Sequence, residues 1–347
     1  TWLTFLLTEV GAIVTGYALD PEPGPSHFEM LGLKNKIKHI VADIRDSETL
    51  NNAMLAFQPE YVIHLAAQPL VKKSYAEPVE TFSTNVMGSV NLLDAVRKCE
   101  SVRSLVYITS DKCYENVEWI WGYRENDRVG GHDPYSASKG AAEIVFSAYA
   151  RSFFASRPTL GAATTRAGNV IGGGDWALDR IVADSVKAWS NNEKVEIRSP
   201  LATRPWQHVL EPLSGYLRLG QILSDVHCSK LNGEAFNFGP KSEQNHTVVK
   251  LLKDLGKYWG FNDENDAFII TDNIPFNEAG LLKLNCEKAL YFLNWEPTLT
   301  YDETINFIGD WYNAFYLKNV NMKDFTYNQI KLYEIKALSR NQIWINE

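Results

Sequence analysis

Hydrophobic and polar positions over the first 150 residues alternate between two periods. Short, nearly continuous apolar runs suit strands buried on both faces of a sheet, and the stretches between them place apolar residues at helical spacing. Ser47 is the expected N-cap of one of these helices. The predicted strands are residues 12–19, 37–41, 61–67 and 104–109, and the predicted helices are residues 2–9, 47–57, 84–98 and 135–154. This alternation predicts an α/β fold with a doubly wound parallel sheet.

The pattern becomes less regular after residue 167. Strand-like and helical pieces continue there, at residues 195–198, 235–238, 248–259 and 301–317. We expect residues 1–167 to form the first domain. Residues 168–318 then form mainly a smaller α/β substrate-binding lobe, with some of the chain returning to the first domain. Residues 319–347 are polar and mixed, and they stay an unassigned C-terminal tail.

Composition and charge exclude several classes of protein. The 347 residues carry a net charge of −8, which argues against a nucleic-acid or anionic-membrane surface, since both need a basic footprint. The longest apolar runs are five residues, whereas a bilayer span needs about 20. Four cysteines lie far apart without metal-ligand spacing, as free thiols do in a reducing compartment. We therefore expect a cytoplasmic protein with no membrane span and no metal site.

Candidate chemistry begins with Tyr135 and Lys139, which are four residues apart on a predicted helix. They share one helix face, so the ammonium and the phenol can meet one ligand. A nearby ammonium favours the phenolate and lowers the pKa of Tyr135 from about 10, which makes the phenol a usable base. The alternative is an exposed helical pair, because this spacing also arises by chance.

A second polar group, Thr109-Ser110-Asp111-Lys112, follows a predicted strand at its carboxyl end, where ligands bind in open α/β sheets. Ser110 can hydrogen-bond the hydroxyl that Tyr135 deprotonates. Asp111 is a candidate general acid, and Lys112 a further acid or base. The alternative is a polar loop without chemistry.

Leu65-Ala66-Ala67, Thr109-Ser110-Asp111 and Tyr135-x-x-x-Lys139, in that order, resemble the extended short-chain dehydrogenase/reductase family. The similarity is strongest to its NAD-dependent nucleotide-sugar dehydratases and extends over about residues 1 to 315. It is carried by seven ordered blocks, at residues 16–21, 64–69, 109–114, 118–125, 166–176, 204–212 and 237–240.

The resemblance implies a Rossmann-type fold and dehydration of CDP-glucose for deoxysugar and surface polysaccharide synthesis. In such enzymes NAD oxidises the sugar C4 hydroxyl, water leaves across C5–C6, and hydride returns to C6. Tyr135 is then the C4 base, Lys139 anchors ribose, Ser110 orients the C4 oxygen and Asp111 protonates the departing hydroxyl. Lys112 stands where related dehydratases carry Glu, as the C5 base or as electrostatic support for the enolate.

Two alternatives to this function remain. One is a dehydratase or epimerase of another nucleotide sugar. The other is an N-terminally eroded, non-catalytic nucleotide-sugar-binding protein.

Further ligand contacts are expected from the same resemblance and from residue chemistry. Arginines match phosphate geometry, and acidic groups after strands can bind ribose hydroxyls. Asp20 could equally be a turn, Asp43 a helix cap, Asn85 a solvated helix residue and each arginine a surface residue. The cofactor-binding candidates are Asp20, Asp43, Ile44, Leu65, Ala66, Ala67, Asn85, Thr109, Tyr135 and Lys139. The substrate-binding candidates are Asn169, Arg180, Arg204 and Gln207.

The first strand and the Gly-rich loop of this fold are missing from the chain, since Thr1-Trp2-Leu3 resembles the start of the first helix. We expect a longer parent protein. The resemblance also implies a homodimer in which the helices at residues 84–98 and 135–154 form a four-helix bundle. The apolar residues expected there are Val86, Val90, Leu93, Val145, Phe146 and Tyr149; the alternative is that the smaller lobe covers them.

Overall fold

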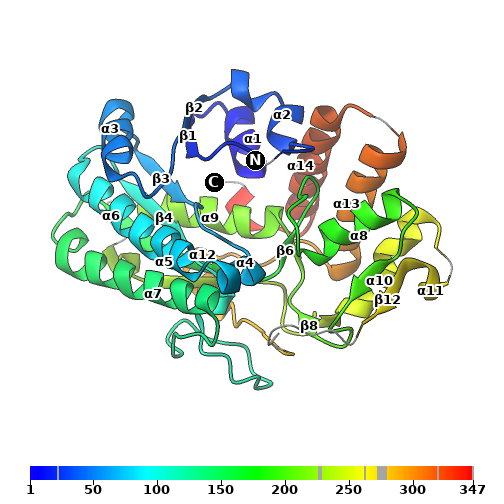
Figure 1. Cartoon of the computed structure of the whole chain (residues 1–347). Coiled ribbons are helices and arrows are strands. Elements are labelled where there is room, and N and C mark those ends of the chain that lie inside the picture. The colour runs from blue at the N-terminus through cyan, green and yellow to red at the C-terminus, as the bar shows by residue number, and fades with distance from the viewer. Residues whose placement is uncertain (22, 226–228, 262, 272–279, 319, 346–347) are drawn as a thin grey trace.

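The computed structural model describes residues 1–21, 23–225, 229–261, 263–271, 280–318 and 320–345 (Figure 1). The strands are β1 (Thr15–Ala18), β2 (Lys38–Val41), β3 (Tyr61–His64), β4 (Ser104–Ile108), β5 (Gly161–Ala167), β6 (Val170–Ile171), β7 (Val195–Ile197), β8 (Thr203–Arg204), β9 (Gln207–His208), β10 (Ala235–Phe238), β11 (His246–Thr247) and β12 (Phe268–Ile270). The α-helices are α1 (Trp2–Glu9), α2 (His27–Met30), α3 (Ser47–Phe57), α4 (Val71–Ala76), α5 (Pro78–Phe82), α6 (Gly88–Lys98), α7 (Pro134–Tyr149), α8 (Ile181–Ser190), α9 (Leu210–Leu223), α10 (Val248–Gly256), α11 (Glu264–Ala267), α12 (Glu287–Leu293), α13 (Tyr301–Asn313) and α14 (Met322–Ser339).

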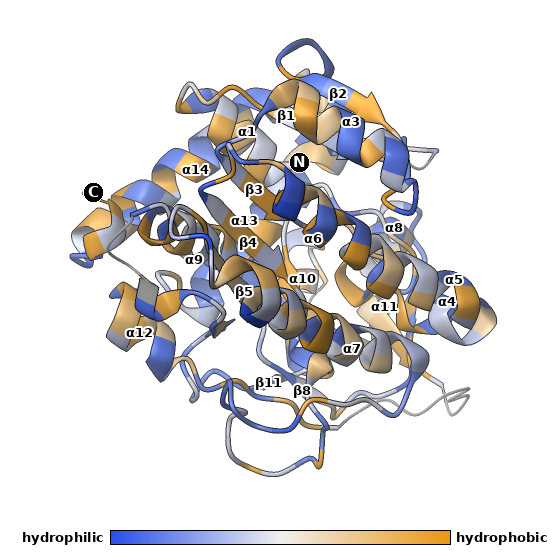
Figure 2. Ribbon diagram, turned by 90° about the vertical axis from the view of Figure 1, so that its left-hand side faces the viewer, coloured by the Kyte–Doolittle hydropathy of each residue, from blue (hydrophilic) through white to orange (hydrophobic). Residues whose placement is uncertain are grey.

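A parallel sheet of four strands, in the order β10-β5-β4-β3, forms the centre of the molecule. Successive side chains of a strand point to opposite faces. Leu105 and Tyr107 of β4 pack with α6 and α7, whereas Val106 belongs to the core that contains α9. Figure 2 shows α6 and α7 on one side of the strands and α9 on the other. The predicted parallel α/β architecture is confirmed.

Strands β1 and β2 form a separate parallel pair beside this sheet. Within the described residues, β1 and β3 therefore each pair along one edge only. Both strands are shorter than predicted, since β1 covers Thr15–Ala18 and β3 covers Tyr61–His64. After β3 the chain forms a loop that begins at Leu65. In this loop the Gln68 N–H donates to the Asn85 side chain at 2.7 Å.

Side-chain caps fix where two helices of the first half begin. The α3 helix is capped by Asp46, whose side chain accepts from the Thr49 N–H, so the prediction of Ser47 as N-cap was wrong by one residue. Asp133 caps α7 and accepts from the Ser136 N–H, and Pro134 follows at the first helical position. Proline suits that position because its missing N–H has no intrahelical partner there. The start of α7 is therefore set by its own sequence.

The second half of the chain builds a smaller lobe and also returns to the sheet. Short pairs occur in the lobe, namely β7 with β12, β8 with β11, and β6 with β9, beside α8, α10 and α13. Strand β10 pairs with β5, and α9 packs against β4 and β5. The lobe and the sheet are thus joined twice after residue 167. The domain boundary itself stays a prediction.

The C-terminal tail, unassigned from its sequence, is largely a helix, α14. Its inward positions are buried, at Met322, Thr326, Gln329, Ile330, Tyr333 and Ala337. Thr326 accepts from the Trp311 indole at 3.0 Å and contacts His27 of α2 at 3.2 Å. The helix therefore joins the N-terminal segment to the second lobe, as its position in Figure 1 also shows.

Candidate active site

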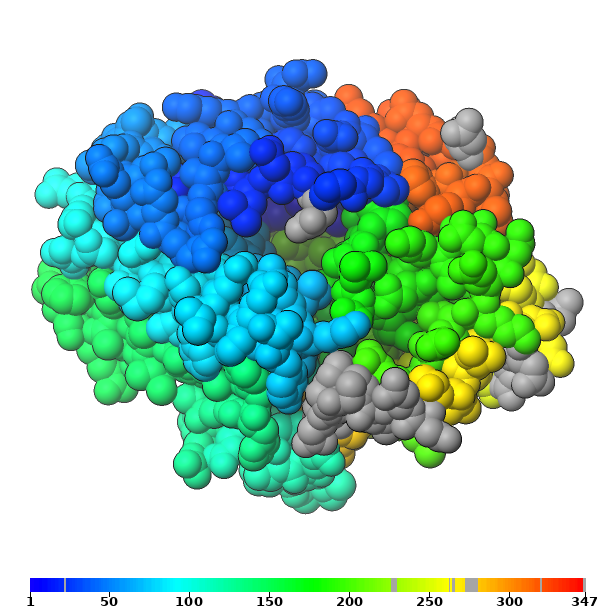
Figure 3. Space-filling model, viewed as in Figure 1, coloured from blue at the N-terminus to red at the C-terminus, as the bar shows by residue number. Residues whose placement is uncertain are grey.

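The surface is hollowed between the N-terminal segment, α4 and the segment that leads into α8 (Figure 3). An ion pair crosses this region, from Lys72 of α4 to Asp179 at 3.0 Å. Within the described residues, no helix is long and apolar enough to span a membrane. No group of three or more His, Cys, Asp or Glu side chains in the described part of the chain is arranged to hold a metal ion.

Tyr135 and Lys139 lie on the first turns of α7, and both are buried. The Tyr135 N–H donates to Ser74 Oγ of α4 at 3.2 Å, which fixes the start of α7 beside the hollow. Burial raises the pKa of Tyr135 to about 12, while a hydrogen bond with Ser110 and the charge of Arg180 oppose this rise. The expectation that Lys139 lowers this pKa is therefore wrong for the protein without ligands, because desolvation is the larger effect.

Lys139 fits the ribose of a dinucleotide. Its ammonium lies 6.0 Å from the centre of the Tyr135 ring, and burial lowers its pKa to about 8. No hydrogen bond from Lys139 Nζ to the described residues is present. A buried ammonium in this position requires acceptors, and vicinal ribose hydroxyls supply them. The residue therefore fits the role of holding NAD.

Ser110, Asp111 and Lys112 form a tight turn after β4. The Ser110 side chain accepts from the Lys112 N–H at 3.2 Å, and this contact caps the 3₁₀ turn Asp111–Cys113. Ser110 Oγ also lies 3.0 Å from Asp111 Oδ1, within reach of its single hydrogen. Because Ser110 also hydrogen-bonds Tyr135, the turn and the start of α7 meet at this hydroxyl.

Asp111 is buried and has one carboxyl oxygen without a partner. Its side chain is 3% exposed, and Oδ2 makes no hydrogen bond to the described residues. Burial raises the pKa of Asp111, with opposition from Lys112, Ser110 and Arg204. A carboxyl held in its protonated form can act as a general acid. Gly168 leaves the space for it, since a Cβ there would lie 2.2 Å from Asp111 Oδ2.

The neighbours of this turn have different surroundings. Lys112 is half-buried, and its charge acts on Asp111. Thr109 was predicted to bind the cofactor, but its hydroxyl donates to Glu143 of α7 and lies near the Thr165 carbonyl at 3.2 Å. The hydroxyl is therefore engaged within the protein, and the cofactor contact of Thr109 stays a prediction.

The cofactor candidates after β1 and β2 lie in different environments. Asp20 is exposed beyond the end of β1. Asp43 pairs with Arg45 at 2.6 Å, and this hydrogen-bonded pairing lowers its pKa; Asp43 is thus neither a helix cap nor a free carboxylate. Ile44 is buried against Gly88, where a Cβ would lie 2.6 Å from Ile44 Cγ2. This close approach seats α6 on the loop after β2.

The segment after β3 presents small side chains beside the hollow. Leu65 is half-exposed, whereas Ala66 and Ala67 are partly buried. Asn85 is 2% exposed and binds the Gln68 backbone at 2.7 and 3.0 Å and Ser138 at 2.9 Å. The solvated alternative for Asn85 is wrong. Its side chain ties the loop after β3 to α7 and has no open face.

Asn169 and Arg180 lie on the second lobe's side of the hollow. Asn169 has φ of 41°, a left-handed conformation that asparagine tolerates better than most residues. Arg180 pairs with Asp175 at 3.2 Å and is near enough to influence the pKa of Tyr135. The Arg180 guanidinium is therefore held by an ion pair at a distance from which its charge acts on the Tyr135 phenol.

Arg204 of β8 and Gln207 of β9 lie near the Ser110–Lys112 turn and Gly168. The Arg204 charge acts on Asp111, and its Nη1 donates to the Thr203 carbonyl at 2.9 Å. Gln207 is 1% exposed, and its amide donates to the carbonyls of Gly168 and Phe238 at 3.0 and 2.9 Å. The side-chain amide of Gln207 holds the Gly168 loop in place. None of its atoms is exposed for a direct contact with cytosine.

Sequence reasoning missed Ser74 and Gly168. Ser74 lies far from Tyr135 in the chain and carries no motif. Gly168 is one residue of a matched block, but the space that it leaves for Asp111 is visible only in three dimensions.

The parallel sheet, the Tyr135–Lys139 pair on α7 and the Ser110–Lys112 turn after β4 define an extended short-chain dehydrogenase/reductase. A family model described as GDP-mannose 4,6 dehydratase matches residues 25–307. The chain belongs to this family. It is 48% identical over 318 residues to the CDP-glucose 4,6-dehydratase of Salmonella typhimurium, covering 90% of this chain and 87% of that protein.

Solved structures share the fold. A UDP-glucose-4-epimerase from Stenotrophomonas maltophila, with bound NAD, superposes with a TM-score of 0.77 at 20% identity, over 90% of this chain and 94% of that one. The dTDP-glucose 4,6-dehydratase of Bacillus anthracis, in complex with NAD, gives a TM-score of 0.74 at 19% identity, over 90% and 92% of the two chains.

Proposed function

We propose that this protein is a NAD-dependent dehydratase that converts CDP-glucose to CDP-4-keto-6-deoxyglucose. The product would feed deoxysugar and surface polysaccharide synthesis in the cytoplasm. The 48% identity to a CDP-glucose 4,6-dehydratase supports the reaction and the substrate. Three described cysteines, Cys99, Cys113 and Cys286, are free, in keeping with a reducing compartment, and Cys228 lies outside the described residues.

The observation that carries the proposal is the buried carboxyl of Asp111, with Oδ2 unpartnered beside Ser110 and Tyr135. An epimerase at C4 removes no hydroxyl from C6 and has no use for a second acid there. A dehydratase must protonate a leaving hydroxyl. A carboxyl whose pKa is raised by burial, and which has a free oxygen, is suited to that step.

We assign the remaining proton transfers to the neighbouring groups. Tyr135 takes the C4 hydroxyl proton, and Ser110 orients the C4 oxygen through the hydroxyl that already meets the Tyr135 phenol. Lys112, beside Asp111, is assigned the C5 proton: its amine accepts that proton, and the resulting ammonium supports the enolate. Each of these groups is attached to β4 or to the first turn of α7.

Lys139 would hold the nicotinamide ribose of NAD, with Leu65, Ala66 and Ala67 beside it after β3 and Asp20 and Asp43 after the strands of the neighbouring pair. When bound, NAD supplies the reversible oxidation at C4 that makes the C5 proton acidic.

Arg180 and Arg204 would bind the diphosphate of the substrate, because a guanidinium matches phosphate oxygens in a two-bond geometry. Asn169 precedes both arginines in the sequence and is next to Gly168, the glycine that accommodates Asp111. Cytosine presents an amino donor where uracil has a carbonyl. A site that accepts this donor rejects uracil strongly, because its buried acceptor would be left unpaired.

The test compares CDP-glucose with UDP-glucose as substrates in the presence of NAD. We expect NMR to identify the 4-keto-6-deoxy product from CDP-glucose, with a larger kcat/KM than for UDP-glucose. Equal kcat/KM values would move the assignment to a general nucleotide-glucose dehydratase. Interconversion of glucose and galactose without water loss would overturn the proposed reaction.

A further inference from the structure

The catalytic groups lie on two separate parts of the chain. Tyr135 and Lys139 belong to α7, whereas Ser110, Asp111 and Lys112 belong to the turn after β4. Proton transfer requires these groups to keep their relative positions closely, since a displacement of about 1 Å can cost about a hundredfold in rate. A connection between the helix and the turn is therefore part of the catalytic design.

A buried ion pair makes this connection. Glu143 lies one helical turn after Lys139 on α7, and Arg166 lies on β5. Arg166 Nε donates to Glu143 Oε1 at 3.0 Å, and Nη2 donates to Oε2 at 2.8 Å. The two side chains are 5% and 6% exposed. The Arg–Glu contact is therefore a two-bond pair shielded from water.

Each side chain of the ion pair hydrogen-bonds a residue at one end of the catalytic turn. Thr109, immediately before Ser110, donates its hydroxyl to Glu143. Tyr114, immediately after the turn, receives a hydrogen bond from Arg166 Nη1 at 2.9 Å and lies under its guanidinium, 4.8 Å from the ring centre. Thus Glu143 holds the entry of the turn, and Arg166 holds its exit.

The same two side chains reach the strands beneath the turn. Thr164 of β5 donates to Glu143 Oε2 at 2.9 Å. The Tyr114 hydroxyl in turn donates a hydrogen bond to the Asn237 side chain of β10 at 2.7 Å. The pair is thus bonded to α7, to both ends of the turn and to β5, and through Tyr114 to β10.

Stability alone is a weak reason for such a pair. Burying two charges costs about as much as their attraction returns, and apolar replacements of similar volume are often neutral or stabilising. We propose that Glu143 and Arg166 are positioning residues that hold the Ser110–Lys112 turn in register with Tyr135 and Lys139. This proposal rests on the proposed function, because it assigns the pair to the chemistry of that site.

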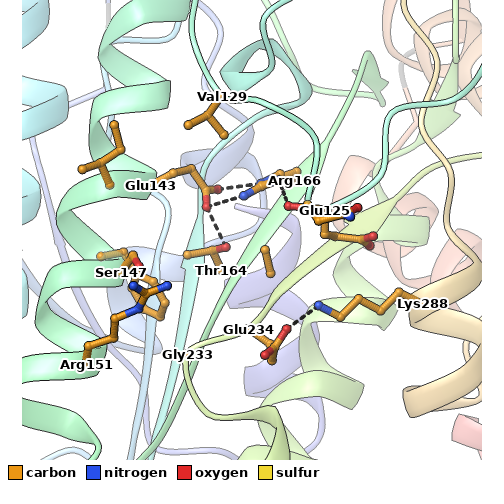
Figure 4. Close-up of a pocket in the computed structure, with 14 residues that line it drawn as sticks. Glu125, Val129, Glu143, Ser147, Arg151, Thr164, Arg166, Gly233, Glu234 and Lys288 are labelled. Atoms are coloured by element: carbon orange, nitrogen blue, oxygen red, sulfur yellow. Dashed lines mark hydrogen bonds and ion pairs between the residues drawn. The ribbon is translucent and has the colours of Figure 1, made fainter.

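A cavity of about 360 Å³ beside the pair supplies a matched control (Figure 4). A second ion pair, Lys288 with Glu234 at 2.6 Å, lies on the wall of the same cavity. None of its contacts reaches the catalytic turn. Glu234→Gln therefore removes a more exposed carboxylate from the wall of the same cavity without touching Thr109 or Tyr114.

The decisive variant replaces both charges, Glu143→Leu with Arg166→Met. We expect it to fold with an unfolding temperature at or above that of the wild type, because no charge is left buried alone. We expect kcat to fall by about a hundredfold while KM for CDP-glucose changes by less than about threefold. Amide hydrogen exchange over residues 109–114, measured without NAD or substrate, should become faster. Glu234→Gln should leave all three quantities unchanged.

Arg166→Lys tests the same connection while keeping the buried charge. A lysine has one nitrogen and cannot serve Glu143 and Tyr114 with the forked geometry of arginine. We expect kcat to fall by about tenfold, the effect of losing one charged hydrogen bond. If either variant is folded and keeps the kcat and the exchange rates of the wild type, the positioning role is wrong.

The two proposals fail in different ways. A wild-type protein that does not dehydrate CDP-glucose refutes the proposed function, while the exchange measurement still reports on the ion pair. An active wild type whose folded variants are equally active, with an equally protected turn, refutes the positioning role alone.

Discussion

Tyr135 and Asp111 are two weak acids that meet the same serine and need opposite protonation states. Burial raises the pKa of both, to about 12 for Tyr135. For Asp111 this shift favours the protonated form, which the proposed acid role requires. For Tyr135 it opposes the phenolate, while the nearby Ser110 side chain and the charge of Arg180 favour deprotonation.

Removal of the Tyr135 hydroxyl tests its role as the base at C4. Tyr135→Phe keeps the ring beside Lys139 and removes the ionisable group, so we expect kcat to fall by about 10²–10⁴-fold with nearly unchanged NAD affinity. Steady-state rates and a NAD titration measure the two quantities. A variant with the wild-type rate would assign the base elsewhere.

Asp111→Asn is expected to separate oxidation from water loss. The amide retains the shape of the side chain but cannot protonate the departing C6 hydroxyl. Exchange of hydrogen at C4, or a transient absorbance of NADH, should therefore persist while dehydration fails. Rapid-mixing absorbance and product analysis distinguish the two steps. Water loss at the full rate would refute the acid role of Asp111.

Spacing and strand position could predict that Tyr135 and Lys139 share a helix face and that Ser110–Lys112 follow a strand, because both are local properties. The actual pKa of Tyr135 could not be predicted, since it depends on how deeply the folded chain buries the phenol. Gln207 and Asn85 look like ligand contacts in the sequence. In the folded chain the Asn85 amide binds the Gln68 backbone. Gln207 Nε2 donates to the Gly168 carbonyl, but its Oε1 has no partner among the described residues, so its substrate contact stays a prediction.

At the scale of elements, α14 shows where the hydrophobic pattern is insufficient. Its buried positions follow helical spacing, but Thr326 and Gln329 are polar, and both satisfy partners on α13. The buried face of α14 is therefore continuous in the structure, although polar residues interrupt its apolar pattern in the sequence. Strands and helices of the first half were predictable because their inward positions are almost all apolar.

Tyr333 of α14 also meets a buried carboxyl on α9. Glu211 accepts from the Thr298 and Leu299 N–H groups at 2.8 and 2.6 Å and from Tyr333 Oη at 3.0 Å. Burial raises the pKa of Glu211 from 4.5 to about 7. Its proton therefore contributes stability that is fully present below pH 4.5 and is lost as the pH rises through about 7.

Glu211→Gln should remove this pH dependence. As the pH rises from about 5 to about 8, we expect the unfolding free energy of the wild type to fall relative to that of the variant. Urea unfolding at several pH values measures it. Glu334→Gln, a change at a half-buried position on α14, should show no such trend. A difference that is constant with pH for Glu211→Gln would show that this carboxyl is not protonated in the folded state.

At the scale of the whole molecule, the face formed by α6 and α7 is the proposed dimer surface. Two expected contacts are corrected, since Leu93 and Phe146 are buried within the chain itself. Val86, Val90, Val145 and Tyr149 are partly buried, and Met87 and Phe153 nearby are 53% and 45% exposed. These exposed apolar side chains support the proposal of a homodimer.

A homodimer is the expected state at micromolar concentration. Light scattering should give twice the chain mass of 39.3 kDa, because a symmetric contact places each apolar residue against the same helices of the partner. Phe153→Glu should lower this mass by placing a charge in the contact. A single-chain mass for the wild type would contradict the dimer.

The central claim is that the protein oxidises C4 of CDP-glucose and eliminates water across C5–C6 in one cycle. It is tested most directly with CDP-glucose that carries deuterium at C4, incubated with the protein and NAD and analysed by mass spectrometry. The account predicts a product lighter by one water that retains the deuterium, now at C6, with no net change in NAD. Unchanged substrate mass, or deuterium lost to NAD with a 4-keto sugar that keeps its C6 hydroxyl as the product, would contradict it.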